Sequence, residues 1–177
     1  IENLRKVDTL IVDKTGTLTE GKPAFHGVVA AAGNSEAEVL RVAASLDQGA
    51  EHPLAQTIVA EARRRELRLE APEKFESASG IGVRGVVAGL TVALGNTALM
   101  EDDGVDWRPL EAQAEALRLE GASVMFLAVA GQAAGLVAVS DPVKHSTPEA
   151  LEALRAGGLT LIMATGDGLT TARAVGR

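Results

Sequence analysis

The fold is decided by the stretch VDTLIVDKTGT, residues 7–17. Its first six residues are mostly apolar and β-branched, and such a short run is typical of a buried strand. A polar turn follows at once, and it begins with Asp13 and contains a glycine. In open α/β sheets, ligands bind and reactions occur at the carboxyl ends of the strands. We therefore expect an α/β fold with a reactive site at Asp13.

A second stretch, near the other end of the chain, has the same form. Residues 160–164 predict another buried strand, which ends at Thr165-Gly166-Asp167-Gly168. The middle of the chain instead predicts amphipathic helices and strands punctuated by glycine. The economical interpretation is an α/β domain, residues 1–22 and 139–177, interrupted by an α+β domain, residues 23–138. We expect an antiparallel sheet flanked by helices in the insertion.

Composition excludes several classes of function. The net charge of −7 argues against non-specific binding of nucleic acid, which needs a cationic surface. The absence of cysteine excludes disulfides, thiolate metal sites and cysteine nucleophiles. No apolar run reaches the roughly 18 residues of a membrane span, so we expect no direct membrane insertion. With only three Phe and one Trp, a purine pocket would have to rely on backbone contacts and aliphatic walls.

Asp13 is the candidate nucleophile. A carboxylate at the end of a central strand can attack a phosphoryl group, provided that cations and oriented donors offset the repulsion between the two anions. Lys14, the hydroxyl groups of Thr15 and Thr17, the backbone around Gly16 and a bound Mg²⁺ would supply that support. The alternative is a turn that merely ends the strand.

The whole string DKTGTLTEGKP, residues 13–23, resembles the phosphorylation loop of P-type ATPases and is similar to their heavy-metal-transporting branch. Further matches follow in the family's order and cover essentially the whole chain. They are Glu51-His52-Pro53-Leu54-Ala55, Ser79-Gly80-Ile81-Gly82-Val83-Arg84-Gly85, Gly95-Asn96, Asp141-Pro142-Val143-Lys144 and Thr165-Gly166-Asp167. The resemblance implies a haloacid-dehalogenase-like phosphorylation (P) domain, interrupted by a nucleotide-binding (N) domain.

The resemblance also implies roles for particular residues. Asp13 would accept a phosphoryl group from ATP, with Lys14 and Thr165 as further catalytic residues. Asp13 and Thr15 would bind Mg²⁺. The residues implied in nucleotide binding are Asp47, Glu51, His52, Gly80, Gly82, Gly95 and Asn96, and those implied at the phosphate or the hinge are Thr15, Gly16, Thr17, Asp141, Lys144, Gly166 and Asp167.

Several of these residues also have a purely structural interpretation. His52 could simply cap a helix, although histidine is not a favoured cap. Gly80 and Gly82 could mark strand bulges. Asn96 could be a left-handed turn residue, and Asp141 could begin a turn.

The chain departs from the family pattern in two ways. Asp47 lies where the family usually has a glutamate that faces the adenine amino group, and the shorter side chain could reach it through a water. The chain also ends at Arg177, before the lysine and the Gly-Asp-Gly-x-Asn-Asp motif that complete the Mg²⁺ site, and it starts at Ile1 without a methionine. We therefore expect a fragment with a truncated P domain, which binds ATP or ADP but turns ATP over very slowly or not at all.

For the intact protein, the resemblance implies ATP-driven export of a heavy-metal ion, with the chain on the cytoplasmic side of a membrane beside transmembrane and actuator domains. The stretch around Gly85 and Gly95 is more similar to copper exporters than to zinc exporters, and the fragment itself would not bind the ion. Two alternatives remain open: a soluble phosphatase of the haloacid dehalogenase superfamily, and a nucleotide-binding module without catalysis. The phosphatases usually have a second aspartate two residues after the nucleophile, where this chain has Thr15, which cannot act as an acid or base.

Overall fold

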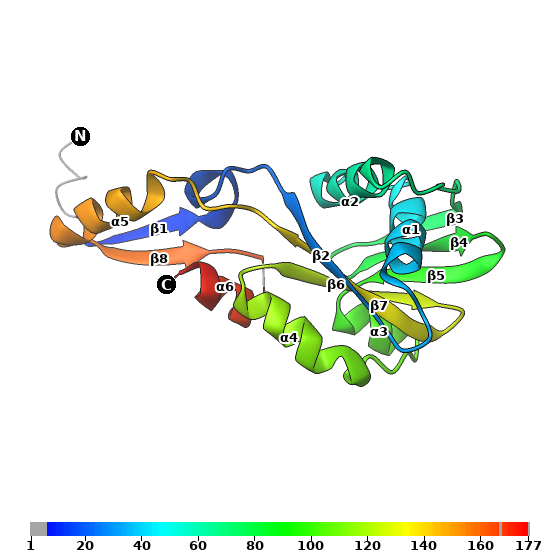
Figure 1. Cartoon of the computed structure of the whole chain (residues 1–177). Helices are drawn as coiled ribbons and strands as arrows, with labels where there is room; N and C mark the ends of the chain where they lie inside the picture. The colour runs from blue at the N-terminus through cyan, green and yellow to red at the C-terminus, as the bar shows by residue number, and fades with distance from the viewer. Residues whose placement is uncertain (1–6, 167, 177) are drawn as a thin grey trace.

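The computed structural model describes residues 7–166 and 168–176, and its strands form two separate sheets (Figure 1). A parallel two-stranded sheet pairs β1 (Thr9–Asp13) with β8 (Thr160–Ala164). The other sheet is antiparallel, with the order β2-β7-β6-β5-β4-β3. Its strands are β2 (Ala24–Ala30), β3 (Glu73–Ala78), β4 (Gly82–Val87), β5 (Leu90–Gly95), β6 (Ser123–Val129) and β7 (Gln132–Ser140). We call residues 24–140 the six-stranded region and the described residues on either side of it the two-stranded region.

Helices cover both faces of the six-stranded sheet. On one face, α1 (Glu36–Asp47) and α2 (Pro53–Arg64) pack over a buried cluster that includes Leu94 and Leu127. On the other, α3 (Thr97–Asp102) and α4 (Glu111–Leu119) pack over a cluster around Phe126, with a short 3-10 helix, Arg108–Leu110, before α4. Neighbouring residues of β6 enter opposite clusters because side chains alternate across a strand.

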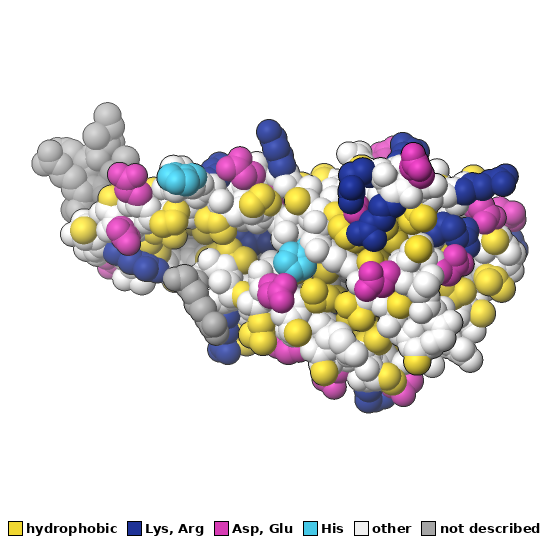
Figure 2. Space-filling model, in the orientation of Figure 1, with side chains coloured by type: hydrophobic (Ala, Val, Ile, Leu, Met, Phe, Trp, Pro, Cys, Tyr) yellow, Lys and Arg dark blue, Asp and Glu magenta, His cyan; other side chains and the backbone are white. Residues whose placement is uncertain are grey.

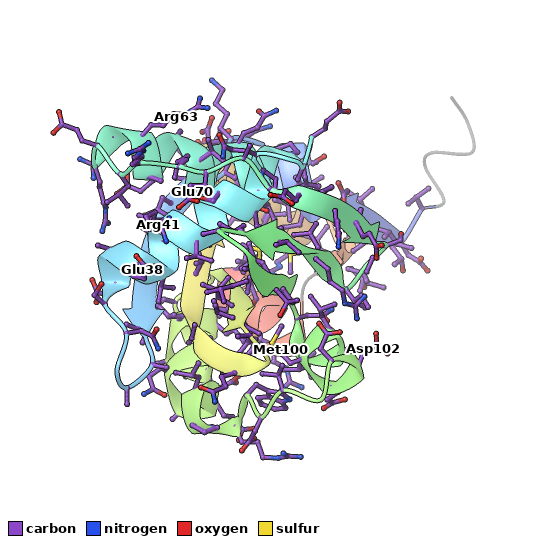
Figure 3. All side chains as sticks on the ribbon, turned by 90° about the vertical axis from the view of Figure 1, so that its right-hand side faces the viewer. Glu38, Arg41, Arg63, Glu70, Met100 and Asp102 are labelled. Atoms are coloured by element: carbon purple, nitrogen blue, oxygen red, sulfur yellow. The ribbon has the colours of Figure 1, made fainter. Side chains whose placement is uncertain are left out.

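Local hydrogen bonds hold α1 in place. The hydroxyl of Ser35 accepts from the Glu38 backbone N–H at 3.2 Å, which is the N-terminal half of a capping box. Arg41 projects from the helix between Glu38 and Glu70, with donor–acceptor distances of 2.8 Å to each (Figure 3). The helix is thereby tied to the segment that leads into β3.

Basic side chains gather over the part of the surface formed by α1 and α2 (Figure 2). Three consecutive arginines, residues 63–65, stand at the end of α2. Arg64 and Arg65 each bind Glu61, at 2.7 Å. Arg63 and Arg64 occupy the last turn of α2, where a cation interacts favourably with the helix dipole.

The two-stranded region is much less buried. It contains α5 (Thr147–Ala156) and α6 (Leu169–Val175), and hydrophobic side chains are visible on its surface between α5 and β8 (Figure 2). The prediction of two buried strands is wrong: exposed and half-buried residues alternate along β1 and β8, with Ile11 66% and Ile162 49% exposed. A two-stranded sheet with helical cover on one face buries only alternate side chains.

Two chain crossings, residues 19–24 and 140–144, connect the regions, and we call them the neck. Ala24 pairs with Ser140 at the end of the six-stranded sheet, and Thr19 forms a bridge with Val143 beyond it. The backbone N–H of Glu20 donates to the carbonyl of Pro142 at 2.8 Å. The antiparallel ladder therefore continues from the sheet into the turn that follows Asp13.

A further contact joins α6 to α4 beside the neck. The hydroxyl of Thr171, which is 2% exposed, donates to the Ala122 carbonyl at 3.0 Å, and that of Thr170 donates to Glu115 at 2.7 Å. None of the helices in the described ranges is both long and apolar enough to cross a membrane.

Candidate functional site

Asp13 and Thr165 lie at the same edge of the two-stranded sheet. Asp13 is the last residue of β1, and it pairs with Ala164, the last residue of β8. Because the strands are parallel, their carboxyl ends meet at one edge, and Thr165 follows directly there. The Asp13 side chain is exposed and Thr165 is half-buried. Asp167, also expected here, lies outside the described residues.

The turn over Lys14–Leu18 is held by hydrogen bonds within the segment itself. Gly16 has a φ of 75°, a conformation that residues with side chains rarely adopt, and no atom lies within 4 Å of the place where a Cβ would be. Its N–H donates to the Thr19 hydroxyl at 3.1 Å. Lys14 is only 6% exposed, whereas Thr15 and Thr17 face solvent. The turn thus leaves an open approach at Gly16.

Asp141 and Lys144 contact this turn from the opposite crossing of the neck. A carboxylate oxygen of Asp141 accepts from the Thr19 hydroxyl at 2.5 Å, and the other accepts from the Lys22 N–H at 3.2 Å. The Lys144 ammonium donates to the Gly16 carbonyl at 2.7 Å. The structure therefore brings both expected hinge residues against the turn that follows Asp13.

Thr19 is a residue that the sequence reasoning missed. It is fully buried, and its hydroxyl joins Gly16 to Asp141 across the neck. A threonine after a turn is common in sequences and does not by itself indicate a contact. The link between Gly16 and Asp141 becomes visible only in the structure, where residues 19–24 and 140–144 pair.

A cleft of about 720 Å³ lies between the α1–α2 connection and strands β4 and β5. All seven residues expected to bind nucleotide line it, namely Asp47, Glu51, His52, Gly80, Gly82, Gly95 and Asn96. Gly166, from the segment after β8, lines it as well. The structure therefore places Gly166, one of the residues expected at the phosphate or the hinge, beside the cleft.

His52 is the N-cap of α2. Its Nδ1 accepts a hydrogen bond from the Leu54 N–H at 3.2 Å. Since Nδ1 is an acceptor, the ring is the neutral tautomer that carries its proton on Nε2, assigned from this hydrogen bond. The capping interpretation is thus correct, and the same geometry leaves an N–H donor that a ligand in the cleft can use.

The glycine loop and Asn96 form the opposite wall. A Cβ at Gly82 would overlap the Leu94 carbonyl oxygen, so β4 and β5 approach closely only because this side chain is absent. Asn96 caps α3 by accepting from the Leu99 N–H at 3.2 Å and donates to the Gly80 carbonyl at 3.1 Å. Its φ of −81° rules out the left-handed turn. Asn96 thus ties the glycine loop to a helix.

Asp47 ends α1 and is 5% exposed. Burial raises the pKa of this carboxyl from 3.8 to about 7. No lysine or arginine is among the described residues that line the cleft. The cleft therefore suits an uncharged ligand group with hydrogen-bond donors better than a phosphate chain.

Phe75, which the sequence reasoning also missed, lines the same cleft from β3. The cleft therefore has an aromatic residue in its wall, in addition to the backbone and aliphatic groups that were expected of a purine pocket. Composition gives the number of aromatic residues in the chain, not where the fold places them.

The carboxyl edge of the two-stranded sheet, at Asp13, offers some but not all of the ligands that Mg²⁺ needs. Asp13 and Thr15 offer oxygen ligands, the type that Mg²⁺ prefers. Within the described part of the chain, no cluster of three or more His, Cys, Asp or Glu side chains could hold a metal ion. The described residues thus supply some of the ligands of a magnesium site.

The chain is similar to known proteins over its whole length. Residues 7–177 match the family model of haloacid dehalogenase-like hydrolases. The whole chain is 45% identical to 22% of a silver-exporting P-type ATPase of Salmonella typhimurium and 49% identical to 21% of a copper-transporting P-type ATPase of Rhizobium leguminosarum bv. viciae. The chain thus spans about a fifth of the length of these relatives.

Solved structures show the same fold. A zinc-transporting PIB-type ATPase in the E2.Pi state has a TM-score of 0.69 and 32% identity, over 96% of this chain and 27% of that one. The N-domain of HMA8, a copper-transporting P-type ATPase, has a TM-score of 0.57 and 27% identity, over 66% of this chain and 99% of that one. The chain belongs to the haloacid dehalogenase-like hydrolase family, in which its similarity is to the catalytic region of heavy-metal-transporting P-type ATPases.

Proposed function

We propose that this chain is the ATP-binding and phosphorylation region of a P-type ATPase that exports a heavy-metal ion, with Cu(I) as the ion. The observation that carries the proposal is that Gly166, one residue beyond Thr165, lines the cleft together with all seven expected nucleotide residues. In this proposal residues 23–138 are the N domain, and residues 1–22 and 139–177 belong to the P domain. The copper- and silver-transporting relatives support the choice of ion.

The reaction is phosphoryl transfer to Asp13. A carboxylate oxygen attacks the γ-phosphorus of ATP, the bond from that phosphorus to the β–γ bridging oxygen breaks, and ADP leaves with the electron pair. The turn contributes the open approach at Gly16, and Lys144 holds the turn through its bond to the Gly16 carbonyl. Lys14 supplies positive charge beside the nucleophile.

Mg²⁺, when bound, offsets the negative charge of the phosphoryl oxygens. The oxygens of Asp13 and Thr15 are the groups of this chain that would hold it. The other described residues at this edge orient the turn and the nucleotide.

A soluble phosphatase is the competing function, because the matching family model is named for hydrolases. Thr15 argues against it. An acid/base group two residues after the nucleophile would activate the water that releases phosphate, and a threonine hydroxyl does not do this at neutral pH. A phosphoenzyme formed here would therefore be long-lived, as a pump requires.

Nucleotide binding and phosphoryl transfer can be tested separately. In calorimetric titration we expect the chain to bind ATP and ADP, His52→Gln to bind them more weakly, and His145→Gln, a matched change far along the chain, to bind them as the wild type does. Equal affinity in the two variants would remove His52 from the site. A nucleotide-binding module without catalysis would pass this test, so it must be followed by a test of phosphorylation.

Phosphorylation is tested in the intact parent protein with radiolabelled ATP. We expect an acid-stable, hydroxylamine-sensitive label that Asp13→Asn abolishes. The isolated chain is expected to show little or no ATP turnover. Rapid release of phosphate from generic phosphate esters by the chain would favour the phosphatase and overturn the proposal.

A further inference from the structure

Helix α6 belongs to the two-stranded region, but two of its side chains bind to the six-stranded region. The hydroxyl of Thr171 donates to the Ala122 carbonyl at 3.0 Å, and that of Thr170 donates to Glu115 at 2.7 Å. Glu115 belongs to α4 and Ala122 follows that helix, which lies beside α6 in Figure 1. We call this pair of hydrogen bonds the anchor. It joins the two regions at a place separate from the neck.

The anchor depends on hydrogen bonds more than on buried apolar surface. Thr171 is the buried residue of α6, whereas Leu169 is 66% exposed. A cavity of about 670 Å³ borders the anchor, and Glu115, Thr170 and Thr171 all line it. Open space rather than close packing therefore lies beside these bonds. An attachment of this kind opens at a modest cost, because water replaces the protein partners of the exposed groups.

The segment in front of α6 forms part of the cleft wall. Gly166 lines the proposed nucleotide cleft and also lines the cavity beside α4. It follows β8, which pairs with β1, and it lies five residues before Thr171. Gly166 is therefore held from two sides, by the sheet that carries Asp13 and by the anchor. A change on either side would move it relative to the cleft.

The neck by itself leaves the angle between the two regions open to change. It consists of two antiparallel crossings, bridged at Thr19 and Val143, and the twist of such a two-stranded ribbon varies more than that of a wide sheet. Rotation of two regions about a few connecting residues is a hinge motion. A second attachment that is separate from the hinge, such as the anchor, fixes the angle.

We infer that Thr170 and Thr171 are positioning residues, whose bonds to α4 and Ala122 fix the angle of the two-stranded region about the neck and so hold Gly166 in the wall of the cleft. The inference rests on the proposed nucleotide site and adds to it two residues that do not line the cleft. Two hydrogen bonds of ordinary net strength shift an equilibrium about 5- to 150-fold. Loss of both hydroxyl groups should therefore favour more open arrangements by that factor.

Distances between spin labels test the anchor in the absence of nucleotide. The chain has no cysteine, so Glu101→Cys on α3 and Glu149→Cys on α5, both at exposed positions, give one labelling site in each region. Pulsed electron paramagnetic resonance should give a narrow distance distribution while both anchor hydroxyl groups are present. Thr170→Val combined with Thr171→Val should broaden it. A broad distribution with the anchor intact, or an unchanged one in the valine variant, overturns the inference.

Two controls separate the hydrogen bonds from other effects of substitution. Thr170→Ser combined with Thr171→Ser keeps both hydroxyl groups and should keep the narrow distribution. Thr91→Val changes an exposed threonine of β5 and should also leave the distribution unchanged. Thermal unfolding shows which variants fold. If the double valine variant does not, Glu115→Ala, which removes one acceptor of the anchor, replaces it, and an unchanged distribution in that variant overturns the inference.

Phosphorylation in the intact parent protein tests the consequence for the proposed site. At saturating ATP, Thr170→Val combined with Thr171→Val should slow the labelling of Asp13 by about fivefold or more, and the serine pair should restore the rate. ATP affinity in calorimetry should change little, because all seven expected nucleotide residues lie in the six-stranded region. An unchanged rate contradicts the positioning role, whatever happens to the affinity. Failure of the wild-type chain to bind ATP would overturn the nucleotide site but not the distance result.

Discussion

The six-stranded and two-stranded regions are stabilised in different ways. All of the buried hydrophobic residues in the described chain lie between Val28 and Val139, in two clusters on opposite faces of one sheet. The buried residues of the two-stranded region are instead polar: Lys14, Thr19, Thr147 and Thr171. Removal of apolar surface from water stabilises the first region, whereas hydrogen bonds position the second.

This difference separates the cleft from Asp13, the proposed nucleophile. The cleft is built on a packed core, which fixes a wall of backbone and side chains to within small tolerances. Asp13 is exposed at the end of β1, a strand along which exposed and half-buried residues alternate. A few hydrogen bonds across the neck hold the turn that follows Asp13 in place. The position of this turn therefore depends more on single polar groups than on the total buried area.

The largest effect is expected from truncation in the six-stranded core. Leu40 is fully buried in α1, so Leu40→Ala should lower the free energy of unfolding by about 2–5 kcal/mol. Ile162 of β8 is 49% exposed, and Ile162→Ala should cost less than about 1 kcal/mol because little apolar surface is lost. Urea unfolding measures both. Equal losses would contradict the contrast between the regions.

Asp47 is a buried carboxyl group inside the otherwise mostly apolar interior of the six-stranded region. Its raised pKa predicts that the free energy of unfolding depends on pH. Burial raises its pKa from 3.8 to about 7, so between these values the folded state binds a proton that the unfolded state does not. The contribution of this group to the free energy of unfolding is therefore fully present below about pH 4 and is lost as the pH rises through 7. The total loss is up to about 4 kcal/mol.

Asp47→Asn removes this titration. The variant should be more stable than the wild type at pH 8 and similar to it at pH 4, as measured by urea unfolding at both values. Asp106→Asn is the control, because the Asp106 side chain is 67% exposed, and it should not change the pH profile. A wild-type chain whose stability does not fall between pH 4 and pH 8 relative to Asp47→Asn would contradict the prediction.

A smaller effect is expected at the neck. Thr19→Val removes the hydroxyl between Gly16 and Asp141 and should cost about 1–3 kcal/mol, because the Gly16 N–H and the half-buried Asp141 carboxylate both lose a hydrogen-bond partner. Hydrogen exchange should show lost protection around Leu18 and Lys144 while the six-stranded amides stay protected. Thr9→Val, at an exposed position of β1, is the control. A uniform loss of protection in both regions would show that they unfold together.

The smallest effect is expected at the α3 cap. Asn96→Ala loses the hydrogen bonds to Leu99 and Gly80 and should cost about 1 kcal/mol. Asn34, in an exposed turn before α1, provides the control Asn34→Ala, which should be nearly neutral. Thermal unfolding resolves the two, and equal midpoints would mean that the cap contributes nothing to the six-stranded region.

Much of this arrangement could be predicted because it depends on local signals. The sequence predicts strands punctuated by glycine in the middle of the chain, and Ala88-Gly89 is such a point, because it joins β4 to β5. Both residues have positive φ, the conformation that tight hairpins favour. The two stretches of strand and polar turn were expected to belong to one α/β domain, and β1 and β8 pair in parallel with Asp13 opposite Ala164.

The errors concern contacts between distant segments. Apolar runs at 7–12 and 160–164 have the composition of buried strands, but burial depends on what covers the sheet, which no local pattern encodes. The partner of Thr19 is 122 residues away, and Phe75 meets Gly49 only after β3 is placed beside the α1–α2 connection. Specific side-chain roles of this kind follow from packing rather than from spacing.

The neck has a consequence for how such a chain can be rearranged. Because paired residues of antiparallel strands lie only about 4.5–5.5 Å apart, the segment that leaves Thr19 and the one that returns at Val143 are immediate neighbours. The six-stranded region can therefore be exchanged for another domain, or replaced by a short linker, without moving β1, which carries Asp13, or its partner β8. Such modularity allows the cleft and the sheet edge that carries Asp13 to diverge separately within one polypeptide.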